Sequence, residues 1–251
     1  MGDRVVTAAV IVIGDEVLSG RTKDVNINFL AKGLTDIGVR LKEARVIADD
    51  SVTIQEVVGA CRKAYDYVFT TGGIGPTHDD ITAQAIADLI GLPLVLDAEA
   101  HRRLIDRYGE DHLNEARLKM AHVPQGARLI DNPVSAAPGF RVDNVFVMAG
   151  VPMIVEAMFE SFKGELTGGD PVLSRTISSF VMEGELAAGL GAIQERYPTL
   201  SLGSYPYYRG GKFGVSVVVR GTSPNEVEGA VDVVNQLIRE LGGEPIEGER
   251  T

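Results

Sequence analysis

The segment that starts at residue 70 reads TTGGIGPTHDDIT and holds the residue types best suited to chemistry in this chain. Its three glycines let the backbone approach a ligand closely, and their N–H groups can line an anion-binding concavity. Asp79 and Asp80 follow, and because two carboxylates would repel a bare phosphate, a cation is expected between them and the ligand. We predict Asp80 and Asp79 as catalytic and metal-binding residues. The substrate-binding candidates of this segment are Thr71, Gly72, Gly73, Gly75 and Thr77.

The two aspartates also have a purely structural interpretation. Thr77-x-x-Asp80 matches a helix capping box, and acidic residues at a helix N-terminus are favourable by themselves. Capping accounts for one aspartate but not for two that follow three glycines, so we favour the functional interpretation. His78 has a donor for a phosphate, although a lone histidine in a loop is more often solvated.

A second polar loop starts at residue 14 and reads GDEVLSGRTKDVN. Its carboxylates, hydroxyl and two cations suit a polar ligand that carries phosphates, and a solvated loop would have the same composition. Both interpretations stay open on composition alone. The substrate-binding candidates of this loop are Gly14, Asp15, Glu16, Ser19 and Asn26. Asp15 is also a third candidate metal ligand.

Both loops leave the ends of predicted strands. Residues 5–13 form a short uninterrupted apolar run, typical of a strand buried on both faces, and residues 39–47 and 67–71 are predicted as further strands. Helices are predicted between them, with Asn26 as the N-cap of the first and Ser51 or Thr53 as the N-cap of the second. Alternating strands and helices indicate a layered parallel sheet, and ligands of such sheets bind beyond the carboxyl ends of the strands.

The rest of the chain continues this pattern and then changes. We predict helices over 79–90, 98–108 and 153–162, with short strands over 128–130, 140–142 and 145–148. A glycine-rich stretch without apolar periodicity follows, so we place a domain boundary in it and predict domains over 1–165 and 171–251. The second domain is predicted as β-α-β-β-α, with strands over 175–182, 200–207 and 213–220 and helices over 185–197 and 225–241. Residues 244–251 are predicted to be a frayed end.

The fold class is therefore α/β, a three-layer mostly parallel sheet, with a small α+β domain added. The net charge of −11 argues against nucleic acid as a partner, because phosphates require clustered Lys and Arg. A signal peptide and a membrane span are not evident, so we expect a cytoplasmic protein with no membrane partner. Cys61, the single cysteine, is predicted to be buried in a helix face.

Four stretches in order carry a family resemblance. They are the two loops above, Asn132-Pro133 with Ala137-Pro138-Gly139-Phe140, and Gly150-Val151-Pro152. Together they resemble the competence/damage-inducible protein A (CinA) family, whose first domain has the molybdopterin-binding-like fold of molybdenum-cofactor biosynthesis (MogA-like) proteins and is similar to a domain of eukaryotic FAD synthases. One departure is that Ser135 and Ala136 stand where the family commonly has Gly-Thr.

The resemblance has implications for fold, activity and partners. It implies a stand-alone form that lacks the C-terminal amidase domain and retains a metal-dependent hydrolase of pyrophosphate-linked nucleotides such as ADP-ribose or FAD. The implied cofactor is a divalent metal (Mg²⁺, Mn²⁺ or Co²⁺), with a monovalent cation as a further candidate. The implied partners are a nucleotide or pterin ligand and a second copy in a homodimer. Asp80 would be the essential carboxylate, and Pro138 and Gly139 would add to the substrate site.

Two other functions stay open on the sequence. The same pocket would serve a protein that binds molybdopterin or a nucleotide without turning it over. An interaction scaffold with a decayed site is the third alternative, and the intact glycines with Asp79 and Asp80 argue against it.

Overall fold

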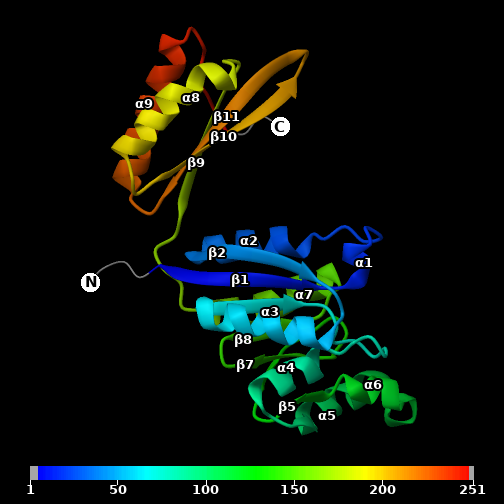
Figure 1. Ribbon diagram of the computed structural model, residues 1–251. Helices are drawn as coiled ribbons and strands as arrows, with labels where there is room; N and C mark the ends of the chain where they lie inside the picture. The colour runs from blue at the N-terminus through cyan, green and yellow to red at the C-terminus, as the bar shows by residue number, and fades with distance from the viewer. Residues whose placement is uncertain (1–4, 249–251) are drawn as a thin grey trace. The chain divides into compact units, whose positions relative to one another are not determined.

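The computed structural model describes residues 5–248, and the chain divides between Gly169 and Asp170 into two compact units. Figure 1 shows the elements of both units, and each unit is described by itself. The first unit contains, in chain order, β1 (Val6–Ile13), α1 (Asp15–Leu18), α2 (Asn26–Asp36), β2 (Val39–Ile47), α3 (Ser51–Ala64), β3 (Tyr67–Thr71), α4 (Thr82–Ile90), β4 (Leu94–Leu96), α5 (Ala98–Tyr108), η1 (Glu110–His112), α6 (Glu115–Lys119), β5 (His122–Pro124), β6 (Arg128–Ile130), β7 (Gly139–Val142), β8 (Val145–Met148), α7 (Pro152–Phe162) and η2 (Lys163–Glu165).

A six-stranded sheet of order β2-β1-β3-β8-β7-β6 forms the centre of the first unit. The β2-β1, β1-β3 and β3-β8 pairs are parallel, whereas β7 pairs antiparallel with both β8 and β6. The predicted mostly parallel sheet is confirmed. Because β1, β2, β3 and β8 run in the same direction, the loops that follow them leave the same edge of the sheet.

Strand β1 shows why the unit has three layers. Its side chains alternate between the two faces of the sheet, so Ala8, Val10 and Val12 pack in one core and Ala9 and Ile11 in the other. Helices α2 and α7 supply the first core, and α3 and α4 supply the second. Every residue of β1 except one is buried, which explains its uninterrupted apolar sequence. Cys61 is buried in the second core, as predicted.

Three predicted helix starts were wrong. In α2 and α3 a different polar residue binds the first backbone N–H groups, whereas α4 begins later than predicted. Asn26 is the first residue of α2 and not its cap, because the Asp24 carboxylate accepts from the Asn26 and Ile27 backbone N–H groups. Asp50 caps α3 by accepting from the Thr53 N–H, so neither Ser51 nor Thr53 does so. Helix α4 starts at Thr82, which leaves Asp79 and Asp80 in the preceding loop.

The sequence also did not predict the small structure beside α4. Strands β4 and β5 pair as an antiparallel ribbon, and the five-residue helix α6 leads into it. Both elements are too short to show a periodic apolar pattern. They pack near α4 and so bring residues 115–124 towards the glycine loop.

The second unit contains β9 (Leu173–Ser179), α8 (Glu183–Arg196), β10 (Ser201–Arg209), β11 (Lys212–Gly221), α9 (Pro224–Glu240) and β12 (Ile246–Glu247). Its antiparallel sheet has the order β10-β11-β9-β12 and shares one core with α8 and α9. The β-α-β-β-α pattern is as predicted, but residues 246–248 are not a frayed end. Ile246 and Glu247 pair with β9, and the Gly248 carbonyl accepts from the Ser178 hydroxyl at 2.7 Å.

Candidate functional site

Four loops meet at the carboxyl edge of the sheet in the first unit. The Asp15 backbone N–H, after β1, donates to Asp49 Oδ2, after β2, at 2.9 Å. The Asn26 Nδ2 donates to the carbonyl of Gly150, after β8, at 2.9 Å. The Gly72 N–H, after β3, donates to the Met148 carbonyl at 3.1 Å. These bonds hold the two predicted ligand loops side by side.

The glycine loop turns where other residues would clash. Gly72 has a φ of +104°, and a Cβ there would lie 2.1 Å from the Ile13 carbonyl oxygen at the end of β1. Gly73 has a φ of +68°, and its Cβ would lie 2.1 Å from Thr82 Oγ1. The Thr82 hydroxyl donates to the Gly72 carbonyl, which fixes the loop on the first turn of α4. The loop conformation therefore depends on glycine at both positions.

Asp80 and Asp79 share one hydroxyl. Asp80 Oδ2 accepts from the Thr77 N–H at 2.8 Å and lies 2.6 Å from Thr77 Oγ1, which also lies 2.5 Å from Asp79 Oδ1. The hydroxyl bond is the main reason that the pKa of Asp79 lies below its usual value. A Cβ on Gly75 would meet Asp80 Oδ2 at 2.7 Å, so that glycine makes room for the carboxylate. The structural alternative, a helix capping box at Thr77-x-x-Asp80, does not stand at a helix start, because Asp80 closes a loop and α4 begins only at Thr82.

The Lys119 side chain places a positive charge beside these carboxylates. Its Nζ donates to the Thr77 carbonyl, and its charge contributes to the lowered pKa of Asp79. Lys119 is the last residue of α6, 39 residues beyond Asp80 in the chain. No spacing in the sequence connects it with the glycine loop, because only the fold of the β4–β5 ribbon brings it there.

Asp49 is the second residue that sequence reasoning missed. Its pKa is raised, first by burial and then by the negative charges of Asp15, Glu16 and Asp79, although the bond from the Asp15 N–H opposes the shift. The predicted first-loop carboxylates and Asp79 thus lie near enough to Asp49 to repel it. Its position offered a signal, since Asp49 follows the predicted strand 39–47 as Asp15 follows β1.

The described residues contain no group of three or more His, Cys, Asp or Glu side chains placed to hold a metal ion. The predicted ligands Asp15, Asp79 and Asp80 therefore do not form a ready three-carboxylate cage. The carboxylates are instead spread over the loops after β1, β2 and β3.

The remaining predicted residues take several positions. The Thr71 side chain is fully buried, so its hydroxyl does not reach the surface. Gly139 is a buried residue of β7, and a Cβ there would lie 2.3 Å from the Val147 carbonyl oxygen, so close strand packing accounts for it. Pro138 lines a cavity beside the glycine loop. Ser19 is exposed and its hydroxyl donates to the Glu16 carbonyl. Gly14 is buried, and its N–H donates to the Ile47 carbonyl.

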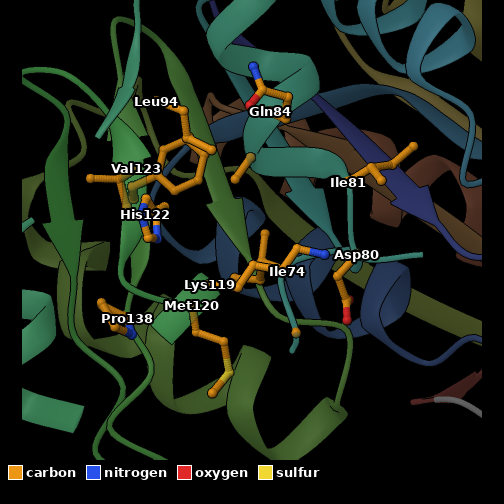
Figure 2. A pocket seen from close by; sticks show the side chains of 13 residues that line it. Ile74, Asp80, Ile81, Gln84, Leu94, Lys119, Met120, His122, Val123 and Pro138 are labelled. Carbon is orange, nitrogen blue, oxygen red and sulfur yellow. The ribbon is translucent and has the colours of Figure 1, made fainter. Parts of the chain in front are cut away.

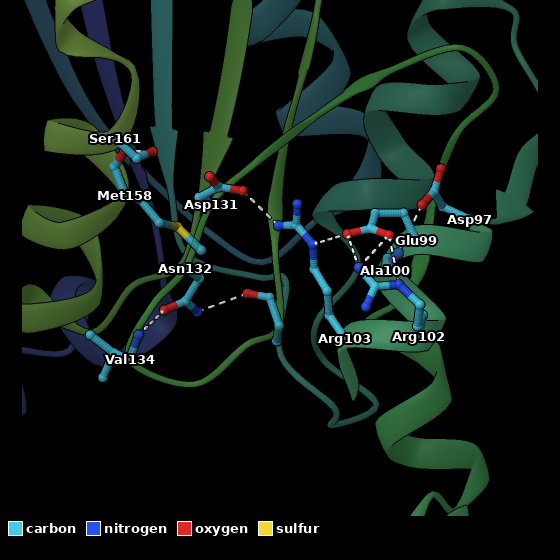
Figure 3. Close-up of polar contacts among 11 residues, drawn as sticks. Asp97, Glu99, Ala100, Arg102, Arg103, Asp131, Asn132, Val134, Met158 and Ser161 are labelled. Atoms are coloured by element: carbon cyan, nitrogen blue, oxygen red, sulfur yellow. Dashed lines mark hydrogen bonds and ion pairs between the residues drawn. The ribbon is translucent and has the colours of Figure 1, made fainter. Parts of the chain in front are cut away.

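The Asn132 side chain organises the loop between β6 and β7. Figure 3 shows its amide bound to Val134, where Oδ1 accepts from the Val134 N–H at 3.1 Å. Its Nδ2 donates to Ser135 Oγ at 2.6 Å. Asp131 accepts from Arg103 of α5 at 2.6 Å, which ties the loop to that helix. Ala136 in this loop has a φ of +63°, a conformation that favours glycine.

Comparison with known families gives one match for each unit of the chain. Residues 9–168 match the model of a family described as "Probable molybdopterin binding domain". The chain belongs to this molybdopterin-binding domain family. Residues 171–243 match a second family, the middle domain of FAD synthase.

Similar proteins support membership of the molybdopterin-binding domain family and the CinA resemblance. A protein of Archaeoglobus fulgidus is 34% identical over 232 residues, which cover 92% of this chain and 97% of that protein. The crystal structure of CinA from Thermoplasma acidophilum, titled as a protein of unknown function, is 36% identical with a TM-score of 0.60 and covers 63% of this chain and 96% of that one. A probable FAD synthase of Caenorhabditis briggsae is 29% identical over 92% of this chain but only 49% of its own length.

No helix within residues 5–248 combines the length and apolar character that a membrane span requires.

Proposed function

We propose that the first unit of this protein is a metal-dependent hydrolase of pyrophosphate-linked nucleotides of the ADP-ribose or FAD type. The observation that carries the proposal is the meeting of the glycine loop, the Asp79–Asp80 pair and Lys119 at the carboxyl edge of the sheet. Backbone N–H groups and a cation suit a pyrophosphate, and carboxylates beside them suit a water or a metal ion. The family descriptions, which name molybdopterin and FAD synthase, support a pterin or nucleotide as the small-molecule ligand.

Asp80 has the geometry to position the attacking water. Its Oδ2 is engaged by Thr77, whereas no hydrogen bond among the described residues engages its Oδ1, which can accept from a water. The water oxygen would form a bond to the phosphorus of the AMP half, and the bond from that phosphorus to the bridging oxygen would break. The products are AMP and a second phosphomonoester, and the proton from water passes to the carboxylate.

A metal ion would fit this site if protein carboxylates and substrate phosphates coordinated it together. Mg²⁺ commonly keeps several waters and takes one or two carboxylates together with substrate phosphates, so a three-carboxylate cage is not required. Asp79, Asp15 and Asp49 are the candidate ligands. The pKa of Asp49 is raised first by burial and then by the negative charges of Asp15, Glu16 and Asp79, and a cation would relieve that repulsion. When bound, a divalent ion neutralises phosphate charge and acidifies a coordinated water.

The test is release of AMP from ADP-ribose and from FAD by the full chain, with the AMP quantified by chromatography. The assay contains Mg²⁺, Mn²⁺ or Co²⁺ in turn, and a chelator in the control. We expect release that requires the metal. No release with any metal would overturn the hydrolase proposal.

A protein that binds molybdopterin or a nucleotide without turnover is the second candidate. The family description and the lack of a three-ligand cluster within residues 5–248 favour it. A nucleotide-induced rise in melting temperature without AMP release in the same solutions would establish this function in place of hydrolysis.

A further inference from the structure

A cavity of about 150 Å³ lies behind the glycine loop of the first unit. Ile74, Met120 and Phe140 form apolar walls, and Asp80, Lys119 and His122 lie among its polar groups. Figure 2 shows lining side chains that come from three directions, with Ile74 and Asp80 on the glycine loop, Met120 and His122 on the α6–β5 segment, and Pro138 directly before β7. Asp80 belongs both to this cavity and to the proposed catalytic centre, so a ligand can occupy the two at once.

The volume of the cavity limits what it holds. A water occupies about 30 Å³ of the liquid, so the cavity corresponds to about five waters, and an apolar cavity of about this volume accepts benzene. Pockets that bury a drug-sized ligand measure about 300–1,000 Å³. The cavity therefore suits one flat heterocycle and not a whole dinucleotide. Its apolar walls suit the faces of such a ring.

The polar groups of the cavity indicate which ring and which direction. His122 Nδ1 lies 3.0 Å from the Leu118 carbonyl, which can only accept, so Nδ1 carries the proton and Nε2 of the neutral ring is an acceptor. An exocyclic amino group is the complementary donor. Lys119 Nζ lies at the Thr77 carbonyl and acts on the charge of Asp79, so it stands on the glycine-loop side, where phosphates would follow the ring.

We propose that this cavity binds the adenine ring of the nucleotide, with Lys119 as a phosphate-binding residue at its mouth. The inference rests on the proposed function, since adenine is the ring that ADP-ribose and FAD share. It adds that the AMP half is the half recognised. A ring system as large as the flavin would lie outside.

Binding of AMP and of inorganic pyrophosphate, measured by calorimetry with Mg²⁺, tests this without any turnover. Ala83→Met places a longer side chain into the cavity from α4, and we expect it to weaken AMP at least tenfold and pyrophosphate less than twofold. Lys119→Gln should weaken both ligands. Ala60→Met, on an exposed position of α3, is the matched control and should change neither.

Leu94→Phe fills the cavity from β4 and replaces Ala83→Met if that variant does not fold, as judged by circular dichroism. The proposal is overturned if wild type does not bind AMP, if a folded cavity-filling variant binds AMP within twofold of wild type, or if pyrophosphate weakens as much as AMP. The two proposals fail separately. AMP binding that depends on Ala83 without release of AMP from ADP-ribose would remove the hydrolase and keep the subsite. Wild-type turnover and KM in Ala83→Met would keep the hydrolase and remove the adenine subsite.

Discussion

The bond from the Asn26 amide to the Gly150 carbonyl offers a sharp test of how the site is assembled. Asn26 is only 6% exposed, and its Nδ2 lies 2.9 Å from a carbonyl 124 residues away. The amide orientation is certain in this setting because a carbonyl accepts and never donates. Replacing the donor therefore disconnects the loop after β1 from the loop after β8.

Two substitutions separate the lost bond from a new repulsion. Asn26→Ala removes the donor and should lower the free energy of unfolding by about 1–2 kcal/mol. Asn26→Asp keeps the shape but sets a buried carboxylate against the carbonyl, and should cost about 3 kcal/mol at pH 7. At about 2–4 °C per kcal/mol for a unit of this size, the second change lowers the melting temperature by about 6–12 °C.

Scanning calorimetry of the full chain is the assay, because the second unit provides an internal reference. Only the transition of the first unit should move, and tryptophan fluorescence is not an option because the chain has no tryptophan. At pH 4 the introduced carboxyl becomes protonated and can donate, so the deficit of Asn26→Asp should shrink. The reasoning is refuted if Asn26→Asp melts at pH 7 at the wild-type temperature, or above Asn26→Ala.

Three further predictions follow from the loops. Gly72→Ala should lower the free energy of unfolding in urea by more than about 2 kcal/mol, because its Cβ would meet the Ile13 carbonyl. Gly91 also has a positive φ, of +75°, but no atom lies near its Cβ position, so Gly91→Ala should cost about 1 kcal/mol. Equal costs for the two variants would contradict the clash. Asp49→Asn should raise stability at pH 7 by about 0.5 kcal/mol. Because the pKa of Asp49 is raised in the folded protein, the destabilisation caused by its charge grows as pH rises through that pKa. Wild type and Asp49→Asn should therefore have the same melting temperature below about pH 3. Ala136→Gly should raise the free energy of unfolding by about 0.5 kcal/mol and the melting temperature with it, because Ala136 has a φ of +63°. A melting temperature below that of wild type would contradict this.

The main features of the fold were predictable because they follow from burial patterns. The apolar run of β1 and the helical spacing in α2 and α3 reflect cores on both faces of the sheet. Helix starts were less predictable, since several polar residues compete for each end. Asp24 and Asp50, and not Asn26 or Ser51, accept from the first backbone N–H groups of α2 and α3. This choice depends on local loop geometry, which the sequence pattern does not contain.

The candidate site was predictable where it is contiguous in sequence. The glycine loop lies with Asp79 and Asp80 in one sequence segment, so its residue types alone predict a site. Lys119 joins the site only through the fold, by way of a five-residue helix. Asp49 had a sequence signal in its position after a predicted strand, but its place beside Asp15 depends on the strand order of the sheet. Thr71 shows the opposite case, because its position at the end of β3, directly before the glycine loop, suggested a ligand contact and its side chain is buried.

The decisive measurement of hydrolysis at this site is metal-dependent AMP release from ADP-ribose by wild type, Asp80→Asn and Asp88→Asn. Asp88 lies exposed on α4, and its carboxylate accepts only from the Gln84 side chain among the described residues, so its variant controls for the loss of one carboxylate. We expect release by wild type and Asp88→Asn, and at least a hundredfold loss in a folded Asp80→Asn. Undiminished release by Asp80→Asn, with its fold confirmed by circular dichroism, would contradict the assignment of Asp80 as the residue on which turnover depends.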